Sequence, residues 1–472
     1  MPTENFIHGQ FVPPSGDRSV PSLNPSDLTD VVANPAVSTP QDVDAAVRGA
    51  AEAFPAWRKA TGSTRAEALY KWAGAIQARS EDLAQAIARE VGKPIAEARG
   101  EVGRCVVILR YYAGEAVRSV GEVVPALAPG ALQFSIRDPL GIVGLITPWN
   151  FPIAIPLWKA APALAFGNTV IVKVSEHAPF VSGLLAETAQ AAELPPGLFN
   201  VILGDGEAGS ALATHQAVKA ISFTGSAATG AKIASACAAR NAKFQTEMGG
   251  KNVAIVLPDA DLDQAANLIA GGAMRYAGQK CTATSRVVVD RAVEEGLWMR
   301  LRAQVESLPL GPVTDPKAAI GPLISAASRD RTLDAVRSVS PDYQTPVPGD
   351  WAGCFFGPAM FRGLDPADRV VQDELFAPVL AILPAEGLDE ALALANATPY
   401  GLSASLFTKN LSEALRYIHR IEAGMVRVNG DTTGVDPHAP FGGVKGSSSG
   451  TREQGRAAIE FYTETKTVQL NP

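Results

Sequence analysis

The sequence has few of the residues that build disulfide-stapled or metal-centred proteins. Its 472 residues include only four cysteines, at positions 105, 237, 281 and 354, and none is part of a C-x-x-C arrangement. Its five histidines are scattered, and none pairs with another at helical spacing. We therefore expect neither a disulfide framework nor a histidine-based metal site, and we assign no metal ligands.

Long apolar runs and an excess of positive charge are also missing. Lysine and arginine total 41 against 48 acidic residues, so the net charge is −7 and gives no basic footprint for nucleic acid. The most apolar stretch, 151–172, is interrupted by three prolines, Lys159 and Asn168, which argues against a membrane span. The first residues show no basic region followed by an apolar core, so we expect no secretory signal and a reducing, cytoplasmic location.

Length and hydrophobic content indicate more than one domain. With 47% hydrophobic residues in 472, the chain is too large for one core and predicts two or three domains. Residues 6–12 are typical of a short edge hairpin. Residues 42–121 show helix-like spacing with breaks near 61–63 and 92–94, and Thr39 followed by Pro40 predicts a helix start.

Apolar β-rich runs alternate with helical segments after this region. These runs lie at 141–146, 169–174, 200–203, 220–224 and 252–257. A further run at 285–290 opens a second βα region that reaches about Glu422. Short buried strands that alternate with helices predict an α/β fold built on a parallel, doubly wound sheet.

Two glycine-rich segments follow strands of this predicted sheet. Residues 204–209 match G-x-G-x-x-G, but no acidic residue ends the next strand to hold a ribose, so a glycine-rich turn that opens a helix is favoured. Residues 223–230 precede a helix whose N-terminus would offer N–H groups and a positive dipole end to a pyrophosphate. Taken alone, the second segment also fits a simple capped turn.

A third segment, 446–450 (GSSSG), matches the G-x-S-x-G of serine hydrolases only formally. That mechanism needs a histidine later in the chain, and the last histidine, His438, comes before the serines. We therefore reject a hydrolase and expect a flexible segment or a turn here.

Three residues are candidates for chemistry at a carbonyl group. Cys281 has small neighbours and an adjacent lysine, which would expose and activate a thiolate, although a cysteine in an apolar protein is more often buried filler. Glu247 precedes a glycine pair that permits close approach, although an ordinary surface glutamate fits as well. Asn150 follows a strand, where ligands of open α/β sheets bind, and would donate to an oxyanion; a rigid proline turn is the alternative.

Taken together, these segments resemble the aldehyde dehydrogenase family over almost the whole chain. The motifs, in the family's order, are PWNFP (148–152), FTGS (223–226), EMGGKN (247–252), GQKC (278–281), ELFAPV (374–379) and PFGGVKGS (440–447). The separation of Glu247 from Cys281 (281 − 247 = 34 residues) also fits the family. Each motif alone is weak, but six in register are specific.

The resemblance implies an α/β fold of two doubly wound parallel-sheet (Rossmann-like) domains and a small β oligomerisation arm. The cofactor-binding domain would comprise 1–118 and 137–248, the catalytic domain 249–445, and the arm 119–136 and 446–472. Because the arm strand of family members joins a neighbour's sheet, we expect a homodimer or homotetramer.

The resemblance also implies the site residues. Cys281 would be the nucleophile that carries a thioester, the Asn150 amide and the backbone N–H of Cys281 would hold the oxyanion, and Glu247 would activate the hydrolytic water. Lys173, also counted as catalytic, and Glu176 would hold the adenosine ribose, and Glu176 favours NAD+ while Lys173 leaves NADP+ possible. The other expected cofactor contacts are Glu247 again, Ile146, Thr147, Pro148, Trp149, Ser175, Gly206, Gly209, Phe223, Thr224, Gly225, Ser226, Met248, Gly249, Glu374 and Phe376.

Several substrates stay open at this point. Residues 434–448 look most like the α-ketoglutaric semialdehyde (2,5-dioxovalerate) dehydrogenase branch, whose substrate carries a carboxylate and needs an arginine or lysine in the pocket. Succinate semialdehyde and an aromatic aldehyde such as vanillin or benzaldehyde are the alternatives. Glu247 argues against a CoA-acylating enzyme, and the intact Cys281, Glu247 and Asn150 argue against a catalytically silent binding or structural protein on the same fold.

Overall fold

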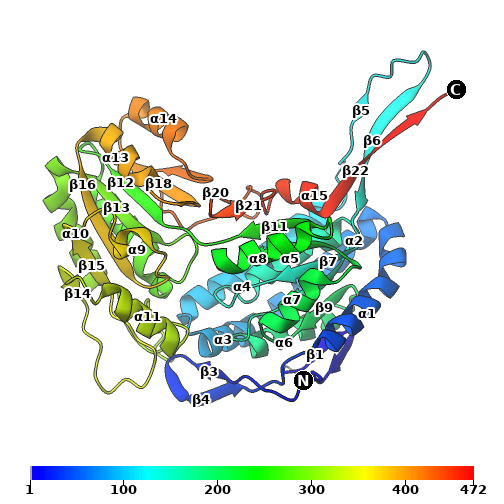
Figure 1. The fold of residues 1–472 in the computed structure, drawn as a ribbon, viewed down its shortest axis with the longest axis horizontal. Coiled ribbons are helices and arrows are strands. Elements are labelled where there is room, and N and C mark those ends of the chain that lie inside the picture. The colour runs from blue at the N-terminus through cyan, green and yellow to red at the C-terminus, as the bar shows by residue number, and fades with distance from the viewer. Residues whose placement is uncertain (1–2, 119) are drawn as a thin grey trace.

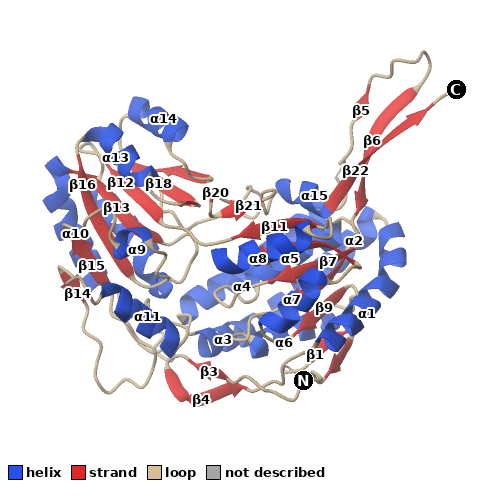
Figure 2. Cartoon of the chain, in the orientation of Figure 1, coloured by secondary structure: helices blue, strands red, loops and turns tan. Residues whose placement is uncertain are grey.

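Two parallel sheets and a projecting arm organise the computed structural model, which describes residues 3–118 and 120–472 (Figure 1). The first sheet lies in one lobe and the second sheet in the other, and helices flank the strands of both (Figure 2). Chain segments cross between the lobes near β11 (Lys243–Glu247), β20 (Val444–Lys445) and β21 (Ser448–Ser449), where the candidate site is built.

The first sheet has the order β2-β1-β9-β8-β7-β10-β11-β21. Its parallel strands are β7 (Ile142–Ile146), β8 (Thr169–Lys173), β9 (Phe199–Ile202), β10 (Val218–Thr224) and β11 (Lys243–Glu247). The predicted edge hairpin is confirmed as β1 (Asn5–Ile7) and β2 (Gln10–Val12). Because β8 and β9 lie on one side of β7 while β10 and β11 lie on the other, strand order reverses between β7 and β10, where ligands of open α/β sheets bind.

The helices of the first lobe follow the predicted pattern. The region expected from residue 42 onward contains α1 (Pro40–Lys59), α2 (Gly62–Ala78), α3 (Ser80–Val91) and α4 (Ile95–Glu115). Thr39 and Asp42 form a capping box at the start of α1. Between the strands lie α5 (Ala154–Ala165), α6 (Pro179–Ala191), α7 (Gly206–Thr214) and α8 (Ala227–Ala238).

The second sheet has the order β14-β15-β16-β13-β12-β18-β19. Its parallel strands are β12 (Asn252–Val256), β13 (Thr284–Asp290), β15 (Ala359–Arg362), β16 (Val379–Ala385), β18 (Ser403–Phe407) and β19 (Met425–Val428), and β14 (Tyr343–Gln344) is antiparallel. Its helices include α9 (Leu262–Met274), α10 (Glu294–Glu306), α11 (Ala326–Val336), α13 (Gly387–Asn396) and α14 (Leu411–Arg420). This region reaches β19, six residues beyond the expected end at Glu422 (428 − 422 = 6).

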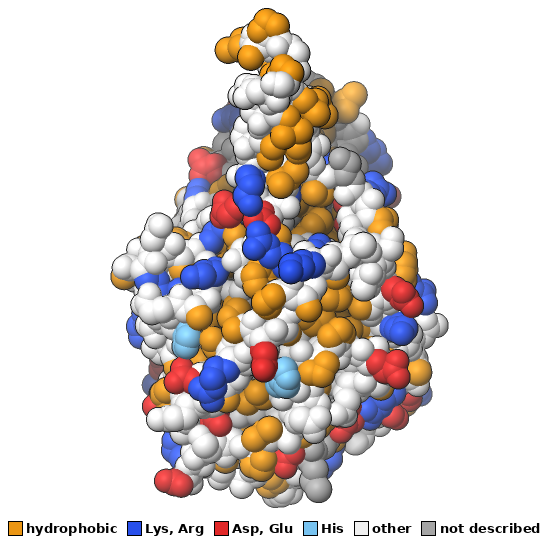
Figure 3. All heavy atoms as spheres, turned by 90° about the vertical axis from the view of Figure 1, so that its right-hand side faces the viewer, with side chains coloured by type: hydrophobic (Ala, Val, Ile, Leu, Met, Phe, Trp, Pro, Cys, Tyr) orange, Lys and Arg blue, Asp and Glu red, His pale blue; other side chains and the backbone are white. Residues whose placement is uncertain are grey.

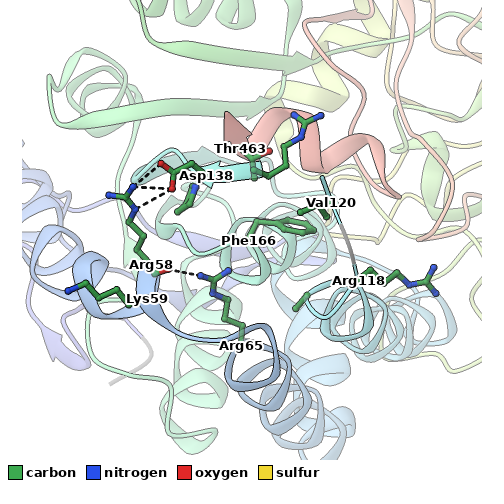
Figure 4. A pocket seen from close by; sticks show the side chains of 11 residues that line it. Arg58, Lys59, Arg65, Arg118, Val120, Asp138, Phe166 and Thr463 are labelled. Carbon is green, nitrogen blue, oxygen red and sulfur yellow. Dashed lines mark hydrogen bonds and ion pairs between the residues drawn. The ribbon is translucent and has the colours of Figure 1, made fainter. Parts of the chain in front are cut away.

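The arm is a three-stranded antiparallel sheet that projects from the first lobe (Figure 1). It consists of β5 (Val123–Val124), β6 (Leu132–Pro139) and β22 (Thr463–Leu470). At its base, Arg58 of α1 donates to both carboxylate oxygens of Asp138 on β6, and Phe166 and Thr463 line the same hollow (Figure 4). This ion pair ties the arm to the first lobe.

The domain division expected from the sequence stays a prediction, with one difference in placement. Part of the segment 446–462, assigned to the arm, packs on the first lobe: β21 (Ser448–Ser449) pairs with β11, and α15 (Ala457–Tyr462) packs against α5. The buried side chains of Phe461 and Tyr462 hold α15 there, so the projecting part begins at β22.

Candidate active site

A cavity of about 470 Å³ brings together loops that are far apart in the sequence. Its wall is formed by loops after β7, β10 and β11, by the segment before β13, and by the segment before β16. The predicted site residues that line it are Pro148, Trp149, Asn150, Thr224, Gly225, Ser226, Met248, Gly249, Cys281, Glu374 and Phe376. Ile146 and Phe223 are register partners on β7 and β10, so the first two loops leave the sheet side by side.

Cys281 differs from the other three cysteines in its exposure, because it is half-buried while they are buried. Its carbonyl oxygen accepts a hydrogen bond of 2.8 Å from Asn252 Nδ2, which fixes the loop before β13 to the start of β12. Two residues upstream of this loop, Tyr276 and Ala277, have left-handed backbone angles (φ 55° and 53°) although neither is glycine. Such strain persists only where surrounding contacts hold it, and it is common at functional sites.

The expectation that the adjacent lysine activates a thiolate is wrong. Lys280 Nζ pairs with Glu97 on α4 at 2.9 Å, so its charge is already compensated there. Burial, together with the nearby carboxylates of Glu374 and Glu247, raises the pKa of the Cys281 thiol to about 12. The thiol is therefore protonated at neutral pH and needs a base before it can act as a nucleophile.

Glu247 lies at the end of β11 and is 2% exposed, so it is not an ordinary surface glutamate. One carboxylate oxygen accepts a hydrogen bond of 2.6 Å from Ser448 Oγ, and the other has no partner within the described part of the chain. Burial and the neighbouring Glu453 raise the pKa of Glu247 well above its usual value. Gly442 leaves room for this carboxylate, because a Cβ added there would lie 2.7 Å from Glu247 Oε1.

The serine segment, expected to be a flexible segment or a turn, is a turn at Gly446 and Ser447 followed by a two-residue edge strand of the first sheet. Ser448 and Ser449 form β21 opposite Glu247 and Thr246. The pairing places a serine hydroxyl beside each of these two residues, and the Ser449 and Thr246 hydroxyls lie 2.5 Å apart. The strand was not anticipated because β21 is only two residues long and its pairing partner lies about 200 residues away.

Asn150 lines the same cavity as Cys281 and is almost fully buried. Its Nδ2 donates to the carbonyl of Gln279 at 3.0 Å, and its Oδ1 has no partner among residues 3–118 and 120–472. An amide carries two N–H groups, so one remains for an oxyanion after the bond to Gln279. The backbone N–H of Cys281 lies beside its own sulfur, where it lowers the thiol pKa slightly.

The groove beyond β7 and β10 fits a dinucleotide. Ser226 caps α8, whose free N–H groups face the groove as the second glycine-rich segment predicts. Thr147 and Thr224 each bury a hydroxyl that has no partner in the described residues, which suits a site that completes its hydrogen bonds with a ligand. At the other end, Trp149 and Phe376 meet edge to face at 5.7 Å.

Glu374 reaches closely into the glycine pair that follows Glu247. Its Oε1 accepts a hydrogen bond of 3.1 Å from the Gly250 N–H, and a Cβ added at Gly249 would lie 1.8 Å from Oε2. Burial raises the pKa of Glu374 to about 7. The close approach that the glycine pair predicts is therefore present, and the group that approaches is this carboxylate.

The residues expected at the adenosine end lie together, beside the cavity rather than on its wall. Lys173 ends β8, is buried, and lies 3.6 Å from the Glu176 carboxylate. Ser175 lies between them, and Gly206 and Gly209 belong to α7, where an added Cβ at Gly209 would lie 3.9 Å from Lys173 Cδ. The preferred interpretation of residues 204–209 as a turn that opens a helix is confirmed, and a catalytic role for Lys173 stays a prediction.

A buried polar network behind Glu247 was not anticipated. Glu453 forms an ion pair with Lys159 and accepts hydrogen bonds from Trp158 Nε1 at 2.8 Å and Ser222 Oγ at 3.0 Å. No local pattern marks Glu453 or Ser448, since both acquire their role from pairing with residues more than 200 positions away.

Within residues 3–118 and 120–472, no helix combines the length and hydropathy needed to cross a bilayer.

Comparison with known proteins identifies relatives along the full chain. The model of the aldehyde dehydrogenase family matches residues 11–468. An α-ketoglutaric semialdehyde dehydrogenase of Bacillus subtilis (strain 168) is 42% identical over 99% of this chain and 98% of its own length. An α-ketoglutarate semialdehyde dehydrogenase of Haloferax volcanii is 38% identical over the same shares.

Solved structures show the same fold. An NAD-dependent aldehyde dehydrogenase from Sinorhizobium meliloti superimposes with a TM-score of 0.95 at 36% identity, covering 99% of this chain and 94% of that one. A betaine aldehyde dehydrogenase from Staphylococcus aureus in complex with NAD+ gives a TM-score of 0.95 at 30% identity, covering 100% and 95%.

Proposed function

This chain belongs to the aldehyde dehydrogenase family, and we propose that it oxidises a small carboxylate-bearing semialdehyde through a thioester on Cys281. It is an NAD(P)+-dependent aldehyde dehydrogenase, and the observation that carries the proposed mechanism is that the thiol and the amide share one cleft while the Glu247 carboxylate acts on the thiol electrostatically. The Cys281 thiol and the Asn150 amide line the same cavity. The Glu247 carboxylate is close enough to the sulfur to raise its pKa.

NAD+ is the cofactor, and it supplies the hydride acceptor for aldehyde oxidation when bound. Gly225 and Ser226, at the N-terminus of α8, would hold the pyrophosphate, because backbone N–H groups and the helix dipole favour an anion there. Lys173 and Glu176 would hold the adenosine ribose. Glu374 and Phe376 would contact the nicotinamide ribose end.

The first half of the reaction depends on how the chain moves one proton and holds one charge. The Cys281 thiol loses its proton to solvent in the cleft, and the sulfur forms a bond to the aldehyde carbon. The carbonyl oxygen gains negative charge, which the free N–H of Asn150 and the backbone N–H of Cys281 stabilise. One such donor is worth about 3–4 kcal/mol of barrier. Loss of hydride from that carbon leaves a thioester on Cys281.

The second half hydrolyses the thioester. Glu247 takes a proton from a water molecule while the water oxygen attacks the acyl carbon. The C–S bond then breaks, and the carboxylic acid is released. Because burial and Glu453 raise the pKa of Glu247 well above its usual value, the basic form of Glu247 becomes more abundant as the pH rises, and the hydrolysis rate should rise with it.

The proposed substrate is α-ketoglutaric semialdehyde. Two relatives that match nearly their whole length carry that activity in their names, and a third, from Saccharolobus solfataricus, is a 2,5-dioxopentanoate dehydrogenase at 34% identity. An aromatic aldehyde or succinate semialdehyde is the alternative. A cytoplasmic location stays a prediction.

The arm supports a proposal that the enzyme is a homodimer or homotetramer. Its exposed apolar side chains include Val123, Leu127, Leu132, Ile136 and Leu470, and Leu127 is fully exposed. Hydrophobic side chains gather along the arm at the top of Figure 3. An exposed apolar β-sheet edge invites pairing with another chain, and a second copy would cover it.

Replacing Cys281 by alanine tests the mechanism. The variant should bind NAD+ as the wild type does, measured by quenching of tryptophan fluorescence, but should not oxidise α-ketoglutaric semialdehyde. Cys354→Ala, which removes a buried thiol outside the cavity, is the matched control and should retain turnover. Turnover by Cys281→Ala at the wild-type rate would reject the nucleophile.

A further inference from the structure

A second cavity, of about 730 Å³, borders the segment that carries Cys281. One face of α4 lines it with Glu97, Gly100, Glu101 and Arg104, which are spaced to lie along one side of a helix. Phe151 and Lys280 also line it, and they adjoin Asn150 and Cys281 in the sequence. The cavity therefore lies next to the segment that carries the reacting sulfur, and its lining shares no residue with that of the dinucleotide groove.

Arg104 presents an uncompensated guanidinium to this cavity. Its Nε and one terminal nitrogen are buried and have no hydrogen-bond partner anywhere in 3–118 or 120–472. Buried donors without partners are costly, so a native protein keeps them mainly where a ligand or water satisfies them. Arg104 also interacts electrostatically with the Cys281 sulfur, which places its charge near the reaction.

The carboxylates around Arg104 do not satisfy it. Glu101 is one helical turn away, but it pairs with Lys93 and accepts the backbone N–H groups of Ile153 and Ala154, each at 3.0 Å. Asp436 acts on Arg104 electrostatically without a hydrogen bond to it in the described residues. The guanidinium thus has no hydrogen bond to a protein carboxylate, and a turn of its side chain would present the fork to a carboxylate that enters the cavity.

The other cations of this cavity are less suited to the same task. Lys280 is held by Glu97 at 2.9 Å. Arg275 and Lys317 are exposed, so a bond to either is weakened by water. Burial makes Arg104 the cation whose charge a substrate would feel most strongly.

We propose that Arg104 binds the carboxylate of the aldehyde substrate and thereby selects short, linear semialdehydes with an anionic end. The inference rests on the proposed function and names the residue that confers its substrate class. Because α4 holds the carboxylate and Cys281 holds the aldehyde carbon, the substrate must carry these two groups at opposite ends of one short chain. An aromatic aldehyde without a carboxylate leaves the buried donors of Arg104 unsatisfied and is selected against.

Arg104→Met tests the inference, because methionine keeps much of the side-chain volume and removes the charge. We compare kcat/KM for α-ketoglutaric semialdehyde with kcat/KM for pentanal, a neutral aldehyde with the same number of carbons. The first should fall about 10- to 100-fold, mainly through KM, as expected for loss of a hydrogen bond to a charged group. The second should be unchanged or rise. Arg104→Lys, which keeps the charge but not the fork, should recover part of the preference.

Arg110→Met is the matched control, since it removes an exposed arginine of the same helix that does not line the cavity, and its ratio of the two kcat/KM values should match the wild type. Equal NAD+ affinity in all variants shows that each is folded. If Arg104→Met keeps the wild-type preference for the semialdehyde, the role of Arg104 is refuted while the proposed substrate stands. If the wild type itself does not prefer the semialdehyde to pentanal, the proposed substrate is refuted and Arg104 with it.

Discussion

Replacing Ser448 by alanine should change the pH dependence of thioester hydrolysis more than it changes the fold. The Ser448 hydroxyl donates to the Glu247 carboxylate at 2.6 Å, and this bond is the main influence that opposes the elevated pKa of that group. Backbone pairing of β21 with β11 does not depend on the side chain. The substitution therefore acts mainly on the charge state of the proposed base.

The size of the effect follows from the bond that is lost. A hydrogen bond to a charged group is worth about 1.5–3 kcal/mol, and each pKa unit corresponds to about 1.4 kcal/mol. The pKa of Glu247 should therefore rise by about 1 to 2 units. Because the group acts in its deprotonated form, the ascending limb of the pH–rate profile for hydrolysis should move to higher pH by the same amount.

The assay is single-turnover hydrolysis of the acyl-enzyme across pH, followed by mass spectrometry of the acyl group on Cys281. Ser449→Ala is the matched control, since it removes the neighbouring hydroxyl of the same strand, which contacts Thr246 and not Glu247. That variant should keep the wild-type profile. A Ser448→Ala profile that coincides with the wild type, or a shift of the same size in Ser449→Ala, would refute the reasoning.

Three further results are expected. Glu247→Gln should still form the thioester but hydrolyse it about 10²- to 10⁴-fold more slowly, and a mass spectrum without added acyl mass would count against the proposed base. The Glu374→Gln variant should lose less stability than the wild type as the pH rises. In the wild type, burial raises the pKa of Glu374 from 4.5 to about 7 in the folded chain, so ionisation of Glu374 destabilises the fold progressively between these two pH values. Urea unfolding at pH 5 and pH 8 should therefore differ by about 3 kcal/mol less in the variant, and an equal difference in both proteins would contradict this. Wild-type enzyme should bind NAD+ more tightly than NADP+ because Glu176 repels a 2′-phosphate; a titration in the reverse order would overturn that preference.

Local patterns predicted much of the first lobe and the placement of its loops. The runs around β7, β8, β9 and β10 are apolar, because both faces of a parallel sheet are covered, and such runs are visible in a sequence. By contrast, β11 (KFQTE) was missed. Its Gln245, Thr246 and Glu247 are buried and polar because they serve the site and the network around Glu453, so the strand lacks the usual hydrophobic signal.

The sequence by itself named the side chains that we propose for the chemistry: the order of the motifs names Cys281, Glu247 and Asn150, because short contiguous segments carry them. Only the tertiary structure decided the state and surroundings of those groups. Lys280 turns to Glu97 instead of the thiol, Ser448 reaches Glu247 from 201 positions away, and Arg104 is left without a carboxylate. Charge state and hydrogen bonding depend on burial and on neighbours from distant segments, and neither quantity is encoded in the residues adjacent along the chain.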